Sequence, residues 1–155
     1  MKDIPHYLAA LATTLWVGGL WAIGYVAAPV LFHAQPDKQL AGMLAGQMFS
    51  VLGYAGIICG MYLLAYRLMM SGKAALREPL FAGIAAMLVI TLAIQFGIQP
   101  LMADLKTQAL PLDVMKIAFA DRFGMWHGIS SILYLAESLL GAWLVIKTFR
   151  AKSDA

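Results

Sequence analysis

The chain has 155 residues, of which 62% are hydrophobic and only 12% are charged, and its formal net charge is +3. A typical soluble domain has roughly 45–50% apolar and about 25% charged residues, so water is not the only solvent of this chain. The composition excludes a disordered chain, a coiled coil and a nucleic-acid binder, and the single cysteine, Cys59, excludes a disulfide scaffold. The remaining class is a small integral membrane protein, with residues 1–155 forming a single four-helix membrane domain.

Four stretches are long and apolar enough to cross a bilayer as helices, which takes about 20 residues. They run over residues 4–32, 49–70, 80–99 and 126–146. Pro29 lies near the end of the first stretch and Pro100 directly follows the third, and we expect each to stop or kink its helix. The predicted fold is an all-α integral membrane protein that forms a four-transmembrane-helix bundle.

The Lys and Arg residues outside the four stretches predict the orientation of the bundle, because cytoplasmic loops carry the excess of them. The ends and loops on one side hold Lys2, Arg67, Lys73, Arg77, Lys147, Arg150 and Lys152. Those on the other side hold Lys38, Lys106, Lys116 and Arg122. This distribution places both termini in the cytoplasm (N-in/C-in). No organelle-targeting pattern is visible, which favours the cytoplasmic (inner) membrane of a bacterium.

Two connections on the outer side have an amphipathic pattern. Residues 36–48 carry apolar side chains at helical spacing, so this segment is expected to lie on the membrane interface or to extend the second helix outward. Residues 113–123 place apolar side chains among charged ones in the same way. The alternative, which the patterns also satisfy, is simple packing of both loops on the bundle.

The fourth stretch carries its polar residues on one face. At 100° per residue, an arc of roughly 120° holds His127, Ser130, Ser131, Tyr134, Glu137, Ser138 and Gly141. The rest of the helix is apolar, Trp143 included, and is predicted to face lipid. The polar face is therefore predicted to point into the bundle.

Glu137 lies about 15 Å from either end of this helix at a rise of 1.5 Å per residue, which is the middle of the bilayer. A charge there costs about 2.5–3.5 kcal/mol on insertion scales, and no Lys or Arg lies deep within any stretch to neutralise it. We expect the carboxyl group to be protonated, to bond Tyr or Gln side chains, or to hold a proton or cation. The functional interpretation is a binding site; the alternative is a neutral carboxyl that joins helices.

The third stretch offers a matching polar face with Thr91, Gln95 and Gln99, while Tyr25 and Ser50 belong to similar faces on the first and second stretches. Together these faces would line a cavity inside the bundle, although plain packing explains the aromatic residues as well. The predicted substrate- or ion-binding residues are Glu137, His127, Tyr134, Ser130, Ser131, Gln95 and Gln99.

His33 and His127 are both predicted near the outer surface, where two imidazoles could hold a metal or a haem iron. Haem and copper are therefore the candidate cofactors, and His6 near the inner end is a further candidate ligand for haem. Ordinary hydrogen bonding of the histidines is the alternative. The chain has no nucleophile triad, phosphate loop, dinucleotide fingerprint or zinc spacing, which argues against an enzyme.

Residues 15–21 read Leu-Trp-Val-Gly-Gly-Leu-Trp, and residues 123–131 read Phe-Gly-Met-Trp-His-Gly-Ile-Ser-Ser. With Gln-Pro-Leu-Met at 99–102, these segments resemble the transmembrane-protein-205-like family of small membrane proteins. The resemblance implies a four-helix bundle and, from the eukaryotic members, an association with tolerance to platinum drugs. The first helix is also similar to the copper-resistance-D family and, more distantly, to haem-synthesis oxidases, which place a histidine before a similar Trp segment, as His6 precedes Trp16 here.

Three functional hypotheses follow from these observations. The first is a transport-like protein that handles a small solute, a metal ion or a metal complex, with Glu137 and His127 at its site. The second is a haem- or metal-binding redox protein, and the third is an accessory subunit that docks another membrane protein. The lipid bilayer is the expected surrounding in every case, and a second copy of the chain is a further candidate partner.

Overall fold

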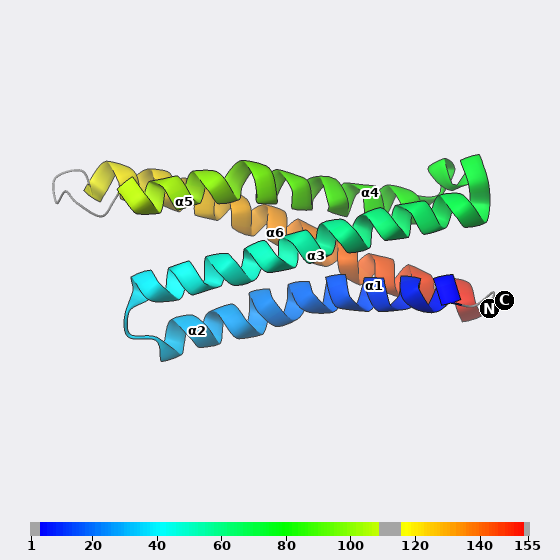
Figure 1. Cartoon of the computed structure of the whole chain (residues 1–155), viewed down its shortest axis with the longest axis horizontal. Coiled ribbons are helices and arrows are strands. Elements are labelled where there is room, and N and C mark those ends of the chain that lie inside the picture. The colour runs from blue at the N-terminus through cyan, green and yellow to red at the C-terminus, as the bar shows by residue number, and fades with distance from the viewer. Residues whose placement is uncertain (1–3, 109–115, 154–155) are drawn as a thin grey trace.

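The computed structural model describes residues 4–108 and 116–153, which are helical almost throughout (Figure 1). In chain order the elements are α1 (Ile4–Trp21), η1 (Ala22–Ala27), α2 (Ala28–Ala34), α3 (Lys38–Ser71), η2 (Gly72–Arg77), α4 (Pro79–Leu92), η3 (Ala93–Ile98), α5 (Gln99–Gln108) and α6 (Lys116–Ser153). Here η1 and η3 are π-helical segments and η2 is a 3₁₀ segment.

These elements form four long rods that run side by side, with the two chain termini at the same end (Figure 1). The rods pack in a ring in which α1 contacts α3, α3 contacts α4, α4 contacts α6, and α6 closes back on α1. Within the described residues, four helices are long and apolar enough to cross a membrane. The predicted all-helical four-span fold is confirmed at this level.

Large apolar side chains cover the outside of the bundle. Leu11, Ile58 and Ile132 are exposed for 65%, 70% and 71% of their surface. A soluble monomer rarely exposes apolar side chains over so continuous a surface, because each would lose the free energy of burial. This outer surface suits the hydrocarbon of a bilayer.

Residues 36–48 adopt one of the two expected arrangements, because the second helix extends through them. Its first residue is Lys38, and Asp37 caps it by accepting hydrogen bonds from the backbone N–H groups of Gln39 (2.8 Å) and Leu40 (3.1 Å). Such a cap satisfies N–H groups that have no partner within the helix. In the second amphipathic segment, residues 116–123 belong to α6, while residues 113–115 lie outside the described part of the chain.

Of the two alternatives expected at Pro29 and Pro100, a stop or a kink, the stop is wrong, since both helices continue past the proline. Each proline is the second residue after a π-helical segment. A proline ring collides with the carbonyl group four residues earlier, which here belongs to Tyr25 and Phe96, both within those segments. The wider π turn shifts the hydrogen-bond pattern where this collision would occur, so the helix accommodates the proline.

The end of the bundle that carries the termini is held together by polar contacts between α1 and α3. The Tyr62 hydroxyl donates to the backbone carbonyl of Pro5 (2.9 Å), and Nδ1 of His6 lies 3.3 Å from the Tyr66 hydroxyl. Further in, the ring of Trp143 packs against Gly83, where an added Cβ would lie 2.5 Å from it. Trp143 is half-buried against α4, so its predicted lipid-facing position is wrong: close approach at a glycine makes room for the ring.

Candidate functional site

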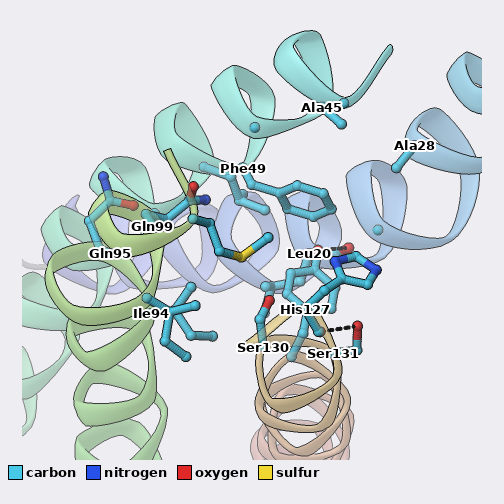
Figure 2. Close-up of a pocket in the computed structure, with 18 of the residues that line it drawn as sticks. Leu20, Ala28, Ala45, Phe49, Ile94, Gln95, Gln99, His127, Ser130 and Ser131 are labelled. Atoms are coloured by element: carbon cyan, nitrogen blue, oxygen red, sulfur yellow. Dashed lines mark hydrogen bonds between the residues drawn. The ribbon is translucent and has the colours of Figure 1, made fainter. Parts of the chain in front are cut away.

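A cavity of about 1000 Å³ lies inside the other half of the bundle, away from the termini. All four rods contribute to its wall, and Figure 2 shows residues of α2, α3, η3, α5 and α6 around one space. Along the third rod the wall extends from Thr91 to Leu105, which spans about 21 Å at the helical rise. The cavity is therefore long and narrow and runs parallel to the helices.

All seven predicted binding residues line this one cavity. His127 and Ser131 are exposed, Ser130, Tyr134 and Gln99 are half-buried, and Gln95 and Glu137 are buried. Figure 2 shows the amides of Gln95 and Gln99 on the side of η3 and α5, and His127 and Ser130 on the side of α6. The polar faces predicted on separate helices thus meet, and the roles proposed for these residues stay predictions.

The buried end of the cavity is called the floor here and consists of Glu137, Thr91 and Trp16. Glu137 is 2% exposed, and its Oε1 lies 2.6 Å from the hydroxyl of Thr91. The side chain of Trp16, whose one polar group is the indole N–H, is a second hydrogen-bond partner of the carboxyl group. Of the three alternatives predicted for Glu137, the one in which it bonds Tyr or Gln side chains is therefore wrong.

The side chains expected as partners are engaged elsewhere. The Tyr134 hydroxyl donates to the backbone carbonyl of Leu20 (2.5 Å), and Nε2 of Gln95 donates to the Ser50 hydroxyl (3.1 Å). In both cases the side chain reaches a neighbouring helix. Tyr134 joins α6 to α1, and Gln95 joins η3 to α3.

The hydroxyl of Thr91 allows Glu137 to be either charged or neutral. Besides its contact with Glu137, this hydroxyl lies 3.0 Å from the backbone carbonyl of Met87, and it has only one proton to donate. A carboxylate can accept that proton, whereas a neutral carboxyl can donate its own proton to Thr91 while Thr91 donates to Met87. The hydrogen bonds of the floor are therefore compatible with both a charged and a neutral carboxyl group.

Three glycines allow side chains of the site to approach neighbouring helices closely. The ring of Tyr134 lies against Gly24, the amide of Gln95 against Gly53, and the indole of Trp16 against Gly56. A Cβ at position 56 would lie only 2.6 Å from Nε1 of Trp16. Larger residues at these positions would displace the polar side chains that they contact.

The opposite end, called the mouth here, is formed by Lys38, Phe123 and His127. The Lys38 ammonium group donates to the backbone carbonyls of Phe32 and Gln35 (2.5 and 3.2 Å). The rings of Phe123 and His127 stack with their centroids 6.0 Å apart and their planes 7° apart. All three residues line the cavity, so charged and aromatic groups lie at this end of it.

The predicted pairing of His33 with His127 is not supported by a shared cavity. His33 is exposed at the end of α2 and is not among the residues that line the cavity, and His6 contacts Tyr66 near the termini. Within the described residues, no three His, Cys, Asp or Glu side chains gather in a group that could hold a metal ion. The haem, copper and metal hypotheses stay predictions.

Sequence reasoning did not identify Trp16 as a partner of Glu137. The signal was the apolar second helix, in which Gly53, Gly56 and Gly60 recur on one face and mark a place where large side chains from other helices fit. A helical wheel of the fourth helix alone does not contain that information.

The fold and the cavity together define a multi-pass membrane protein with a buried polar site between its helices. No curated protein and no solved structure matches the chain. Residues 11–111, more than half of the chain, match the family described as "Domain of unknown function (DUF4149)", and the chain belongs to this family. The matched range contains Trp16, Thr91, Gln95 and Gln99, whereas α6 and Glu137 lie beyond it.

Proposed function

We propose that this protein is a transport-like membrane protein that binds a small solute inside its bundle, with Glu137 as the recognition group. The observation that carries the proposal is that polar side chains from several helices line one cavity, which has a buried carboxyl group at its closed end. Ligand sites in proteins have the same general form: a concave, mostly apolar space of about 300–1,000 Å³ with a few convergent polar groups.

The cavity favours a binding site over packing alone. A carboxyl that only joined two helices would need no space beside it, whereas Glu137, although only 2% exposed, is among the residues that line a cavity of about 1000 Å³. Intramembrane acidic residues are costly and generally mark a functional site. In the proposed function Glu137 binds a proton or a cation, His127 takes part in recognition at the mouth, and Tyr134, Gln95 and Gln99 complete the site.

The distribution of Lys and Arg supports an outward-facing cavity. With both termini in the cytoplasm, the mouth would open on the outer side of a bacterial inner membrane, because it lies at the end of the bundle opposite the termini. The relation to the transmembrane-protein-205-like family and a role in metal tolerance remain proposals that these observations do not bear on. The redox and accessory-subunit hypotheses likewise have no contact in the described residues that favours them.

The proposal is tested by asking whether the cavity retains a small molecule. The purified protein in lipid nanodiscs is incubated with a total small-molecule extract of the source cells, washed, and analysed by native mass spectrometry. Wild type is compared with Ser130→Phe, which puts a ring into the cavity, and with Ser138→Ala, a change at a neighbouring residue that does not line it.

We expect wild type and Ser138→Ala to retain the same additional mass and Ser130→Phe to lose it. Two results would overturn the proposal. In the first, wild type shows only the mass of the protein alone after exposure to the extract. In the second, Ser130→Phe retains the same additional mass as wild type.

A further inference from the structure

The dimensions of the cavity point to an organic ligand and not to a bare ion. A length of about 21 Å and a volume of about 1000 Å³ correspond to a mean cross-section of roughly 50 Å². A single ion with its coordinating atoms occupies a small fraction of that space, whereas an extended hydrocarbon or aromatic chain fits along it. Volumes of this order are typical of sites for drug-sized molecules.

The wall between mouth and floor is mainly apolar and aromatic. Tyr134 lies at its centre, with the ring of Phe49 at 5.3 Å and that of Tyr25 at 6.3 Å, both edge-on. Leu20, Ile94 and Ile98 add aliphatic surface. Such a wall favours an apolar body, because burying apolar surface supplies most of the binding free energy.

The floor contains the two carboxyl oxygens of Glu137, which accept hydrogen bonds, and no Lys or Arg side chain of the floor pairs with them. Glu137 has two oxygens, and its partners in the structure are the Thr91 hydroxyl and the Trp16 indole. An ionised carboxylate accepts up to about four hydrogen bonds, so these two partners leave part of its capacity for a further donor.

Lys38 does not neutralise the floor. It is the one Lys or Arg among the described residues that line the cavity, and it belongs to the mouth. Leu52, which also lines the cavity, lies fourteen positions after Lys38 along α3, and this corresponds to about 21 Å. A salt bridge requires the charged atoms to lie within about 4 Å, so Lys38 at the mouth does not pair with Glu137.

We propose that the ligand is an elongated organic amine, bound with its ammonium head at Glu137 and its apolar or aromatic body along Tyr134 and Phe49. This inference rests on the proposed function and specifies the chemical class that the same site accepts. The head donates charge-assisted hydrogen bonds to the carboxylate, and the body fills the space between floor and mouth.

A matched series of probes tests the proposal: 4-phenylbutylamine, 4-phenylbutanol and 4-phenylbutyrate share one body and differ in the head group. Binding of each is measured by isothermal titration calorimetry on the protein in nanodiscs, with empty nanodiscs subtracted. We expect wild type to bind the amine at least about tenfold more tightly than the alcohol, as one charge-assisted hydrogen bond implies, and to bind the carboxylate more weakly still.

Variants connect this preference to the floor. Glu137→Gln should bring the affinity for the amine to that for the alcohol, while Ser138→Ala should leave the ratio unchanged. If Glu137→Gln does not fold, the ratio of the affinities of wild type for the amine and the alcohol decides. Equal affinities of wild type for amine and alcohol, tighter binding of the carboxylate, or no binding of the amine would each overturn the assignment of the ligand class.

The variant Ser130→Phe distinguishes a wrong ligand class from a wrong proposed function. If the alcohol or the carboxylate binds wild type best and Ser130→Phe abolishes that binding, the cavity binds a solute but not an amine. If Ser130→Phe leaves the binding of every probe unchanged, none of them enters the cavity, and the amine proposal is overturned. The proposed function itself is then decided by the mass retained from the cell extract.

Discussion

Replacement of Gly56 by Ala tests whether the indole of Trp16 is held between α3 and the Glu137 carboxyl. Trp16 is only 1% exposed. A Cβ at position 56 would lie 2.6 Å from its Nε1 and 3.0 Å from its Cδ1, while Gly60 contacts the far edge of the same ring. Because real Cβ atoms do not approach other atoms so closely, the indole or the backbone of α3 must move.

The expected cost follows from two opposing effects. Forcing an extra methyl group into a well-packed site costs about 1–3 kcal/mol. The change from glycine to alanine in a helix interior returns about 0.5–1 kcal/mol. We therefore expect Gly56→Ala to lower the free energy of unfolding by up to about 2.5 kcal/mol. Gly18 is the matched control, because nothing lies within 4 Å of an added Cβ there; Gly18→Ala should be neutral or stabilising by up to about 1 kcal/mol.

Unfolding of both variants and wild type is measured in mixed micelles with increasing SDS, followed by circular dichroism so that a change in tryptophan emission does not bias the midpoint. The order of stability should be Gly18→Ala, wild type, Gly56→Ala. If Gly56→Ala were as stable as Gly18→Ala, the indole would not occupy the position that the structure gives it, and the floor described above would be incorrect.

Three other predictions concern polar groups. The buried hydroxyl of Ser138 has no hydrogen-bond partner among the described residues, so Ser138→Ala should leave stability in the same micelle assay unchanged or raise it by up to about 1 kcal/mol; a clear loss would reveal a partner. Thr91→Val removes the hydroxyl beside the floor carboxyl and should cost about 0.5–1.5 kcal/mol, whereas Thr91→Ser should cost less; equal losses would refute a role of the hydroxyl. Hydrogen bonds from Ser71 and Arg67 hold the pKa of Glu78 below its usual value, so their contribution to stability is present above that value and is lost as the pH falls through the lowered pKa of the folded protein; Glu78→Gln should flatten this acid-side loss in a pH series of thermal melts, and an unchanged profile would contradict the ion pair.

Much of the fold was readable in the sequence, because crossing a bilayer demands long apolar helices. The ends of the helices were harder to predict. The second stretch was predicted to begin at residue 49, yet α3 begins at Lys38, because the cap at Asp37 and the helical spacing of 36–48 extend it beyond the apolar core. The π segments before Pro29 and Pro100 also escaped prediction, since a proline alone does not show whether the helix bends, stops or widens.

The residues of the candidate site were likewise predicted only in part. The polar face of α6 identified Glu137, Tyr134 and His127, because an amphipathic helix within a membrane turns its polar residues inward. The partners of Glu137 could not be predicted in this way. They depend on which helices adjoin and on the glycines that admit Trp16, and both are properties of the packed bundle.

The central claim, a cavity that opens at the end opposite the termini and reaches into the membrane beside Glu137, is tested most directly by cysteine accessibility. In a Cys59→Ala background, single cysteines at positions 130 and 138 are treated in intact cells with a small membrane-impermeant thiol reagent, and the labelled fraction is read by mass spectrometry. With both termini in the cytoplasm, the cysteine at position 130 should be labelled from outside and the cysteine at position 138, which is buried outside the cavity, should not. Failure to label position 130, or equal labelling of both positions, would contradict the cavity.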